Sequence, residues 1–166
     1  MIDKPTQDRI KLLHPDLRDE VTRLVEEANS KLTSHSHMRI IQGLRTIEEQ
    51  NALYAQGRTK KGPIVTKAKG GSSYHNYGLA IDFCLIIDNK EVSWNVDKDY
   101  DGDGLADWME VVKVFKAAGW TWGGDFKTIV DMPHFEKTFN HNWRDLLAKY
   151  EKKDFIEGTK YVKLSK

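Results

Sequence analysis

The segment Ser73–Ile87, SYHNYGLAIDFCLII, decides the fold because its second half is the strongest candidate strand in the chain. Bulky apolar side chains occupy alternate positions, at Leu79, Ile81, Phe83, Leu85 and Ile87. Side chains of a strand alternate between its two faces, so these five share a face that we expect to form the core. The other face carries Asp82 between the small residues Ala80 and Cys84. We expect room there for a metal ion and its further ligands.

Helical and extended patterns alternate on the N-terminal side of this strand. Apolar residues at three- and four-residue spacing predict a helix over 14–32, and a short extended run follows at 38–44. Thr46–Glu49 matches a capping box, which predicts a second helix through Tyr54. Residues 58–74 contain several glycines and paired serines, and they predict a long loop.

The C-terminal side repeats this alternation. We expect a turn at 88–90 with a returning strand at 91–94, a helix at 107–118, a short strand at 120–122, an extended segment from 134 and a helix from Asn142. Strands in the middle with helices before, between and after them favour an α+β fold with a small antiparallel sheet. We expect one domain over 1–140, and a C-terminal helix and tail over 141–166 that packs on it or begins a linker.

Composition narrows the function classes. The 166 residues carry 26 basic and 25 acidic side chains, so a net charge of +1 gives no reason to expect a nucleic-acid partner. Cys84 is the only cysteine, which excludes an internal disulfide and a cysteine-based metal site. The N-terminus has charges and Pro5 where a signal peptide needs an apolar core. We therefore expect a soluble monomer that is made in the cytoplasm and does not insert into membranes.

Two histidines and two aspartates indicate a metal centre. His75 lies seven residues before Asp82, and Asp131 lies three residues before His134. Two imidazoles and one carboxylate supply three ligands and leave a fourth position open, which is what catalytic zinc needs. Pro133 interrupts strand geometry, so Asp131 can lie on the same side as His134 and serve as a base. For either histidine alone, a hydrogen-bonded core residue is the commoner explanation.

Several motifs occur in a consistent order. They are Ser-x-His-x-x-Gly-x-Ala-x-Asp at 73–82, Asp-x-Pro-His at 131–134, the helix segment 45–58 and the turn Trp122–Phe126. Together they resemble the zinc peptidases that cut peptidoglycan peptides, specifically the L-alanyl-D-glutamate peptidases of phage endolysins and bacterial wall hydrolases. The likeness runs from about His14 to Glu136. It implies an α+β domain of the hedgehog or D-Ala-D-Ala-peptidase type.

The resemblance implies a role for each matching residue. His75, Asp82 and His134 would bind zinc, and Asp131 takes the place of the family's catalytic carboxylate. Arg45 would stabilise the oxyanion, a duty that suits a permanently charged planar donor.

Further residues are candidates with ordinary structural alternatives. Ser73, Gln50 and Trp122 could contact substrate, or they could serve as a loop turn, an exposed helix position and a core residue. Glu136 lies two residues after His134 on the same strand face, so it is a rival to Asp131 as the base.

A second metal motif lies at 99–110, DYDGDGLADWME, which satisfies D-x-[DN]-x-[DN]-G-x5-E. Its oxygen donors are Asp99, Asp101, Asp103, Asp107 and Glu110. Crowded aspartates repel one another unless a cation neutralises them, so we expect calcium over a merely solvated acidic loop. Ala106 replaces a larger aliphatic residue and no first helix is evident, so we do not expect a paired EF-hand.

Taken together, these features predict a zinc endopeptidase that hydrolyses the L-Ala-D-Glu bond of peptidoglycan stem peptides, as an endolysin or autolysin. A D,D-carboxypeptidase acting on D-Ala-D-Ala is one alternative, but such relatives tend to carry glutamate and tryptophan before the histidine. A non-catalytic, metal-stabilised wall-binding module is another, but binding would need neither Asp131 nor Arg45. The missing signal peptide fits release through a phage holin, and the cationic loop 58–69 could attract an anionic wall.

Overall fold

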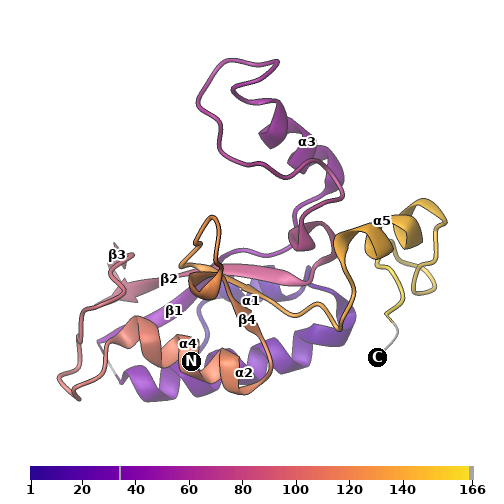
Figure 1. Ribbon diagram of the computed structural model, residues 1–166. Helices are drawn as coiled ribbons and strands as arrows, with labels where there is room; N and C mark the ends of the chain where they lie inside the picture. The colour runs from indigo at the N-terminus through magenta and orange to yellow at the C-terminus, as the bar shows by residue number, and fades with distance from the viewer. Residues whose placement is uncertain (34, 165–166) are drawn as a thin grey trace.

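The computed structural model describes residues 1–33 and 35–164. They form an α+β fold around a five-stranded antiparallel sheet (Figure 1). The helices are α1 (Lys4–Ile10), α2 (Arg18–Leu32), α3 (Ile47–Ala55), α4 (Asp107–Ala117) and α5 (Trp143–Glu151), with the short 3-10 helices η1 (Pro15–Leu17), η2 (Tyr74–Tyr77) and η3 (Gly123–Asp125). The strands are β1 (Ser36–Gln42), β2 (Ala80–Ile87), β3 (Glu91–Ser93), β4 (Thr121–Trp122) and β5 (His134–Glu136).

Strand β2 is the centre of the sheet, whose order is β1-β2-β5-β4. One edge of β2 pairs with β1 along nearly its whole length. Its other edge is divided, because β5 pairs with Ala80–Asp82 and β3 pairs with Leu85–Ile87. The register sets Asp82 directly opposite His134. Two predicted ligands that are far apart in the sequence are therefore cross-strand neighbours.

The core lies between the sheet and the paired helices α2 and α4, which run below the sheet in Figure 1. The five alternating residues of the central strand all belong to it, as predicted. Phe135 of β5 stacks between Phe83 and Phe115, with ring centroids 5.4 Å and 4.7 Å away. On the opposite face Cys84 and Ile86 are also buried, so the opening on that face is confined to the surroundings of Asp82.

The predicted elements agree with the observed ones to within a few residues at their ends, and the Thr46 capping box and the Asn142 cap are both present. Helix α1 is not among the predicted elements. This helix has only seven residues and buries only Thr6 and Ile10, too few apolar positions for a periodic pattern. It packs on β1, and Asp3 caps it by accepting a hydrogen bond from the Thr6 N–H.

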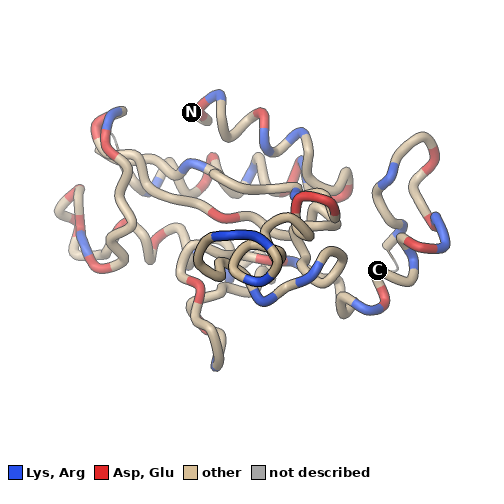
Figure 2. The backbone as a smooth tube through the Cα atoms, turned by 90° about the horizontal axis from the view of Figure 1, so that it is seen from above, with Lys and Arg blue, Asp and Glu red and all other residues tan. Residues whose placement is uncertain are grey.

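Helix α3 and the loop after it extend away from the sheet, at the top of Figure 1. Figure 2 looks down on this region, and Lys and Arg positions gather at its centre. They belong to a loop that has basic residues at 58, 60, 61, 67 and 69 and no acidic residue from 58 to 81. Within residues 1–33 and 35–164, no helix has both the length and the apolar character needed to cross a membrane.

The C-terminal tail contacts the rest of the chain after α5. A ring nitrogen of the buried His14 donates to the carbonyl of Val162 at 2.7 Å, and the Val162 side chain is buried. Phe155 and Val162 form an isolated antiparallel bridge. The last two positions of the predicted tail, 165 and 166, lie outside the described residues. The boundary predicted at residue 140 stays a prediction.

Gly78 fixes the junction between η2 and β2. Its φ is +71°, and a Cβ there would lie 2.5 Å from the backbone nitrogen of His14. We expect Gly78→Ala to lower the free energy of unfolding by at least about 2 kcal/mol more than Gly119→Ala, because a clash adds to the left-handed strain. Gly119 is the matched control, since its φ is +89° and nothing lies within 4 Å of its Cβ position. Equal losses in urea denaturation would contradict this account of the junction.

Candidate metal centre

Three predicted ligands converge where η2, β2 and β5 meet. Asp82 Oδ1 lies 3.0 Å from His134 Nδ1 and 3.4 Å from His75 Nε2. One ligand atom from each residue lies within 4.8 Å of the others. Both histidines are buried, and 21% of the Asp82 side chain is exposed, so the cluster opens to solvent on the carboxylate side.

This donor set fits a tetrahedral transition-metal ion. Metal–ligand bonds of about 2.0–2.2 Å place tetrahedral ligand atoms about 3.3–3.6 Å apart. The separations of 3.0 and 3.4 Å therefore require little adjustment. Three protein ligands leave one coordination position for water or substrate, which is the arrangement of catalytic rather than structural sites.

The outer nitrogen of each histidine has its own acceptor. His75 Nδ1 donates to the carbonyl of Gly43 at 2.7 Å, and His134 Nε2 donates to Glu136 Oε1 at 2.7 Å. Such outer contacts fix the ring and leave the inner nitrogen free to bind metal. Glu136, the predicted rival base, therefore has an orienting contact with His134. No sequence signal marks the Gly43 carbonyl, because every residue has one.

Neighbouring groups in the cluster shift the pKa values of Asp82 and His134. Burial by itself raises the pKa of Asp82, but hydrogen bonds and charge from His134 and His75 hold it well below its usual value. Burial lowers the pKa of His134, whereas Asp82 and Glu136 raise it to about 9. The pocket therefore favours a positive charge between the two histidines, which a metal cation can supply.

The helix η2 sets the position of His75. Ser73 caps this helix, and its Oγ accepts from the His75 N–H at 3.3 Å. Asn76 reaches back to accept from the N–H groups of Gly71 and Ser73, and its own amide donates to the Arg45 carbonyl. In the structure Ser73 thus holds the predicted ligand His75 in place. Its predicted contact with substrate stays a prediction.

Asp131 and His134 lie on one side of a turn, as the Pro133 geometry predicts. Asp131 donates its N–H to Gly123 and accepts one from His134, and its Oδ2 lies 4.0 Å from His134 Nδ1. A Cβ on Gly123 would lie 2.2 Å from the Asp131 carbonyl oxygen, so only glycine permits this approach. About half of the Asp131 side chain is exposed, with 49% accessible. Unlike Glu136, it is open to an incoming molecule.

The charges around Asp131 adjust its basicity. Burial and the charge of Asp82 raise the pKa of Asp131, while His134, His75 and Arg45 act in the opposite direction. The positive charge of the Arg45 guanidinium therefore favours the ionised form of the Asp131 carboxyl group. The backbone ties Arg45 to the cluster as well, because its N–H donates to the His75 carbonyl at 3.0 Å.

Gln50 lies behind Arg45 and has no exposed surface. Its Oε1 accepts from Arg45 Nη1 at 3.0 Å, and its Nε2 donates to the Ala68 carbonyl at 2.8 Å. The amide thus joins the guanidinium to the long loop. Because the side chain is buried and both ends of its amide are hydrogen-bonded, Gln50 is suited to positioning Arg45. Its predicted contact with substrate stays a prediction.

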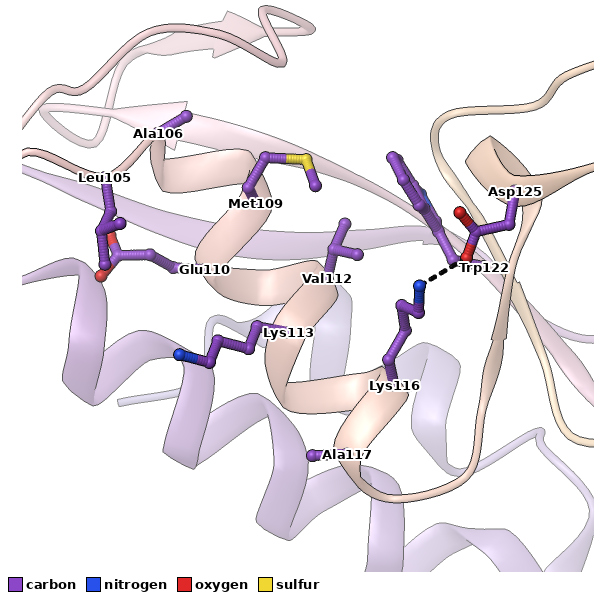
Figure 3. A pocket seen from close by; sticks show the side chains of 10 residues that line it. All are labelled: Leu105, Ala106, Met109, Glu110, Val112, Lys113, Lys116, Ala117, Trp122 and Asp125. Atoms are coloured by element: carbon purple, nitrogen blue, oxygen red, sulfur yellow. Dashed lines mark ion pairs between the residues drawn. The ribbon is translucent and has the colours of Figure 1, made fainter.

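Trp122 is also mostly buried, with 8% exposed. Its indole nitrogen donates to the Met132 carbonyl at 2.7 Å and so holds the turn that carries Asp131. The ring also borders a cavity of about 680 Å³ beside α4, and the paired Lys116 and Asp125 are among the residues that line it (Figure 3). None of the three clustered ligands lines that cavity. Contact of Trp122 with substrate stays a prediction.

Two buried histidines and a carboxylate around an open position, with a further exposed carboxylate beside them, form the site of a metal-dependent hydrolase. Residues 66–137 match the D-alanyl-D-alanine carboxypeptidase family. The chain is 46% identical over 124 residues to the peptidoglycan L-alanyl-D-glutamate endopeptidase CwlK of Bacillus subtilis, covering 75% of this chain and 72% of that protein. It is 30% identical over 101 residues to the L-alanyl-D-glutamate peptidase of Listeria phage A118, covering 58% of this chain and 34% of the phage protein.

Two solved structures have a similar fold. The L-Ala D-Glu endopeptidase ChiX of Serratia marcescens superimposes with a TM-score of 0.54 and 26% identity, covering 86% of this chain and 90% of that one. The vancomycin resistance D,D-dipeptidase VanXYg shares the fold with a TM-score of 0.50 and 22% identity, covering 87% of this chain and 61% of that one. The chain belongs to the family of peptidoglycan L-alanyl-D-glutamate endopeptidases.

Proposed function

We propose that this protein is a zinc-dependent endopeptidase that hydrolyses the L-Ala-D-Glu bond of peptidoglycan stem peptides. The observation that carries the proposal is the convergence of His75, Asp82 and His134 beside the exposed carboxylate of Asp131. The choice of bond rests on similarity to the endopeptidase CwlK, which extends over most of both chains. The choice of zinc rests on the nitrogen and oxygen donor set and on the open fourth position.

Residues of the chain take separate roles in the proposed reaction. Zinc held by the cluster would polarise the scissile carbonyl and lower the pKa of the attacking water. Asp131 accepts the proton from that water and delivers it to the leaving amine. Arg45 opposes the negative charge that develops on the carbonyl oxygen. Glu136 and the Gly43 carbonyl keep the two histidine rings in their binding orientation.

The same two relatives also support a proposal for where the enzyme acts. Similarity to the phage A118 peptidase supports action on the wall as an endolysin, and similarity to CwlK supports a wall hydrolase of a bacterial cell. For the endolysin, we propose release through a holin. The basic loop between 58 and 69 would favour approach to an anionic wall. We propose that the protein acts as a monomer.

The proposal is tested on defined muropeptides. Chelation should abolish cleavage and zinc should restore it, because the three ligands hold the ion that activates water. Mass spectrometry of the products should show new termini at L-Ala and D-Glu. Release of terminal D-Ala would instead identify a D,D-carboxypeptidase, and zinc binding with no cleavage of any muropeptide would identify a binding module.

The base is tested by comparing Asp131→Asn with Glu136→Gln. We expect Asp131→Asn to keep its zinc and lose about 10²–10⁴-fold in kcat, because proton transfer is removed. Glu136→Gln should instead weaken zinc binding by about 10–100-fold and retain turnover when zinc is saturating. Zinc content and kcat are measured on the same samples. The reverse pattern would assign the base to Glu136.

The link from Gln50 to Arg45 is tested by a double-mutant cycle. Gln50→Met keeps the side-chain volume but removes the acceptor, so we expect kcat to fall about tenfold with little change in KM. In an Arg45→Ala background the same change should have little further effect on kcat. Additive losses would show that Gln50 acts by another route, and melting temperatures would separate this from a general loss of stability.

A further inference from the structure

The loop between β3 and α4 brings five carboxylates together away from the metal centre. Ligand atoms of Asp99, Asp101 and Asp107 lie within 4.8 Å of one another, and so do those of Asp101, Asp103 and Glu110. Asp101 belongs to both groups, so the two form one continuous cluster. It shares no residue with the cluster of His75, Asp82 and His134.

Glu110 shows that this cluster is more than a solvated acidic loop. The residue is 7% exposed, and its Oε2 is buried with no hydrogen-bond partner among the described residues. In Figure 3 its side chain leaves α4 and extends toward Leu105. A carboxylate oxygen that is removed from water and left unpaired is costly unless a cation binds it or the group takes up a proton.

The surroundings do not provide that cation. Among the described residues, no Lys or Arg nitrogen lies within 4.0 Å of the five carboxylates. The buried Oδ2 of Asp101 also has no hydrogen-bond partner within residues 1–33 and 35–164. Asp107 is fully buried, and it accepts hydrogen bonds from the Tyr100 N–H and the Ser36 hydroxyl. Asp107 and Glu110 are thus buried, and a hydrogen bond from Ser36 joins Asp107 to β1.

We propose that this cluster binds one calcium ion, with Glu110 as the ligand that closes the site from α4. The donors fall at the first, third, fifth, ninth and twelfth positions of the loop, and the Leu105 carbonyl falls at the seventh. Calcium takes six to eight oxygen ligands in flexible geometry, and several carboxylates with a backbone carbonyl meet that need. Magnesium demands a smaller octahedron and keeps several waters, so the same donor set suits it less well.

Calcium held there would fasten the loop to the first turn of α4. Through Asp107 and Ser36 it would also fasten that turn to β1, on the side of the sheet where α2 and α4 pack. The effect is on stability, and it is independent of the peptidase reaction.

The test uses the zinc-loaded protein in calcium-free buffer, titrated with calcium chloride in a calorimeter and melted with and without the salt. We expect one calcium ion per chain and a higher melting temperature. Glu110→Gln should weaken calcium binding at least tenfold and lose the thermal shift, while its melting temperature without calcium stays equal or rises because a buried charge is removed. Asp97→Asn, just outside the loop, should behave like wild type.

A second variant distinguishes a loss of calcium binding from a loss of folding. Asp103 is exposed, so Asp103→Asn should fold normally and still weaken calcium binding. Absence of calcium binding to the wild type would overturn the proposal. Equal binding by Glu110→Gln, or equal binding of magnesium chloride by the wild type, would overturn it too. Because the readout is binding and melting, failure of the proposed peptidase activity would leave this result unaffected.

Discussion

The pairing of β2 with β5 is the constraint on which the functional part of the molecule depends. Three residue pairs set the register, and one of them places Asp82 opposite His134. A slip by one residue would turn one of these side chains to the other face and separate the ligands. The same pairing brings Phe135 into the aromatic stack with Phe83 and Phe115, so core packing and ligand geometry stabilise one register.

The surrounding contacts show how a buried polar cluster is kept specific. The inner atoms of His75, Asp82 and His134 face one another, and each histidine is held from outside by a carbonyl or a carboxylate. Asp131 differs because its carboxylate is about half exposed while its backbone is bonded to Gly123. A rigid backbone with an accessible side chain suits a group that must exchange protons with a substrate. The difference in exposure therefore favours Asp131 over Glu136 as the proposed base more clearly than their spacing from His134 does.

Much of the fold was predictable because its local signals are strong. Alternation in the central strand, the capping box at Thr46 and the helical spacing before Leu32 each specify an element without reference to the rest of the chain. Helix α1 was missed because it is short and buries only two side chains. The contacts of Gln50 could not be predicted from the sequence, for another reason. A glutamine on a helix gives no sign that a loop will cover it and that Arg45 will be its partner.

The sequence by itself determined the strand that carries Asp82, the order of the helices and strands, and which histidines and aspartates were candidate ligands. These depend on periodicity and on residue chemistry, which are local properties. Only the tertiary structure decided that Glu136 bonds to His134, that Ser73 and Gln50 hold ligands and charges in place, and that Glu110 is enclosed without a hydrogen-bond partner for one oxygen. Hydrogen-bond partners and burial arise between segments far apart in the chain, so no local pattern can record them.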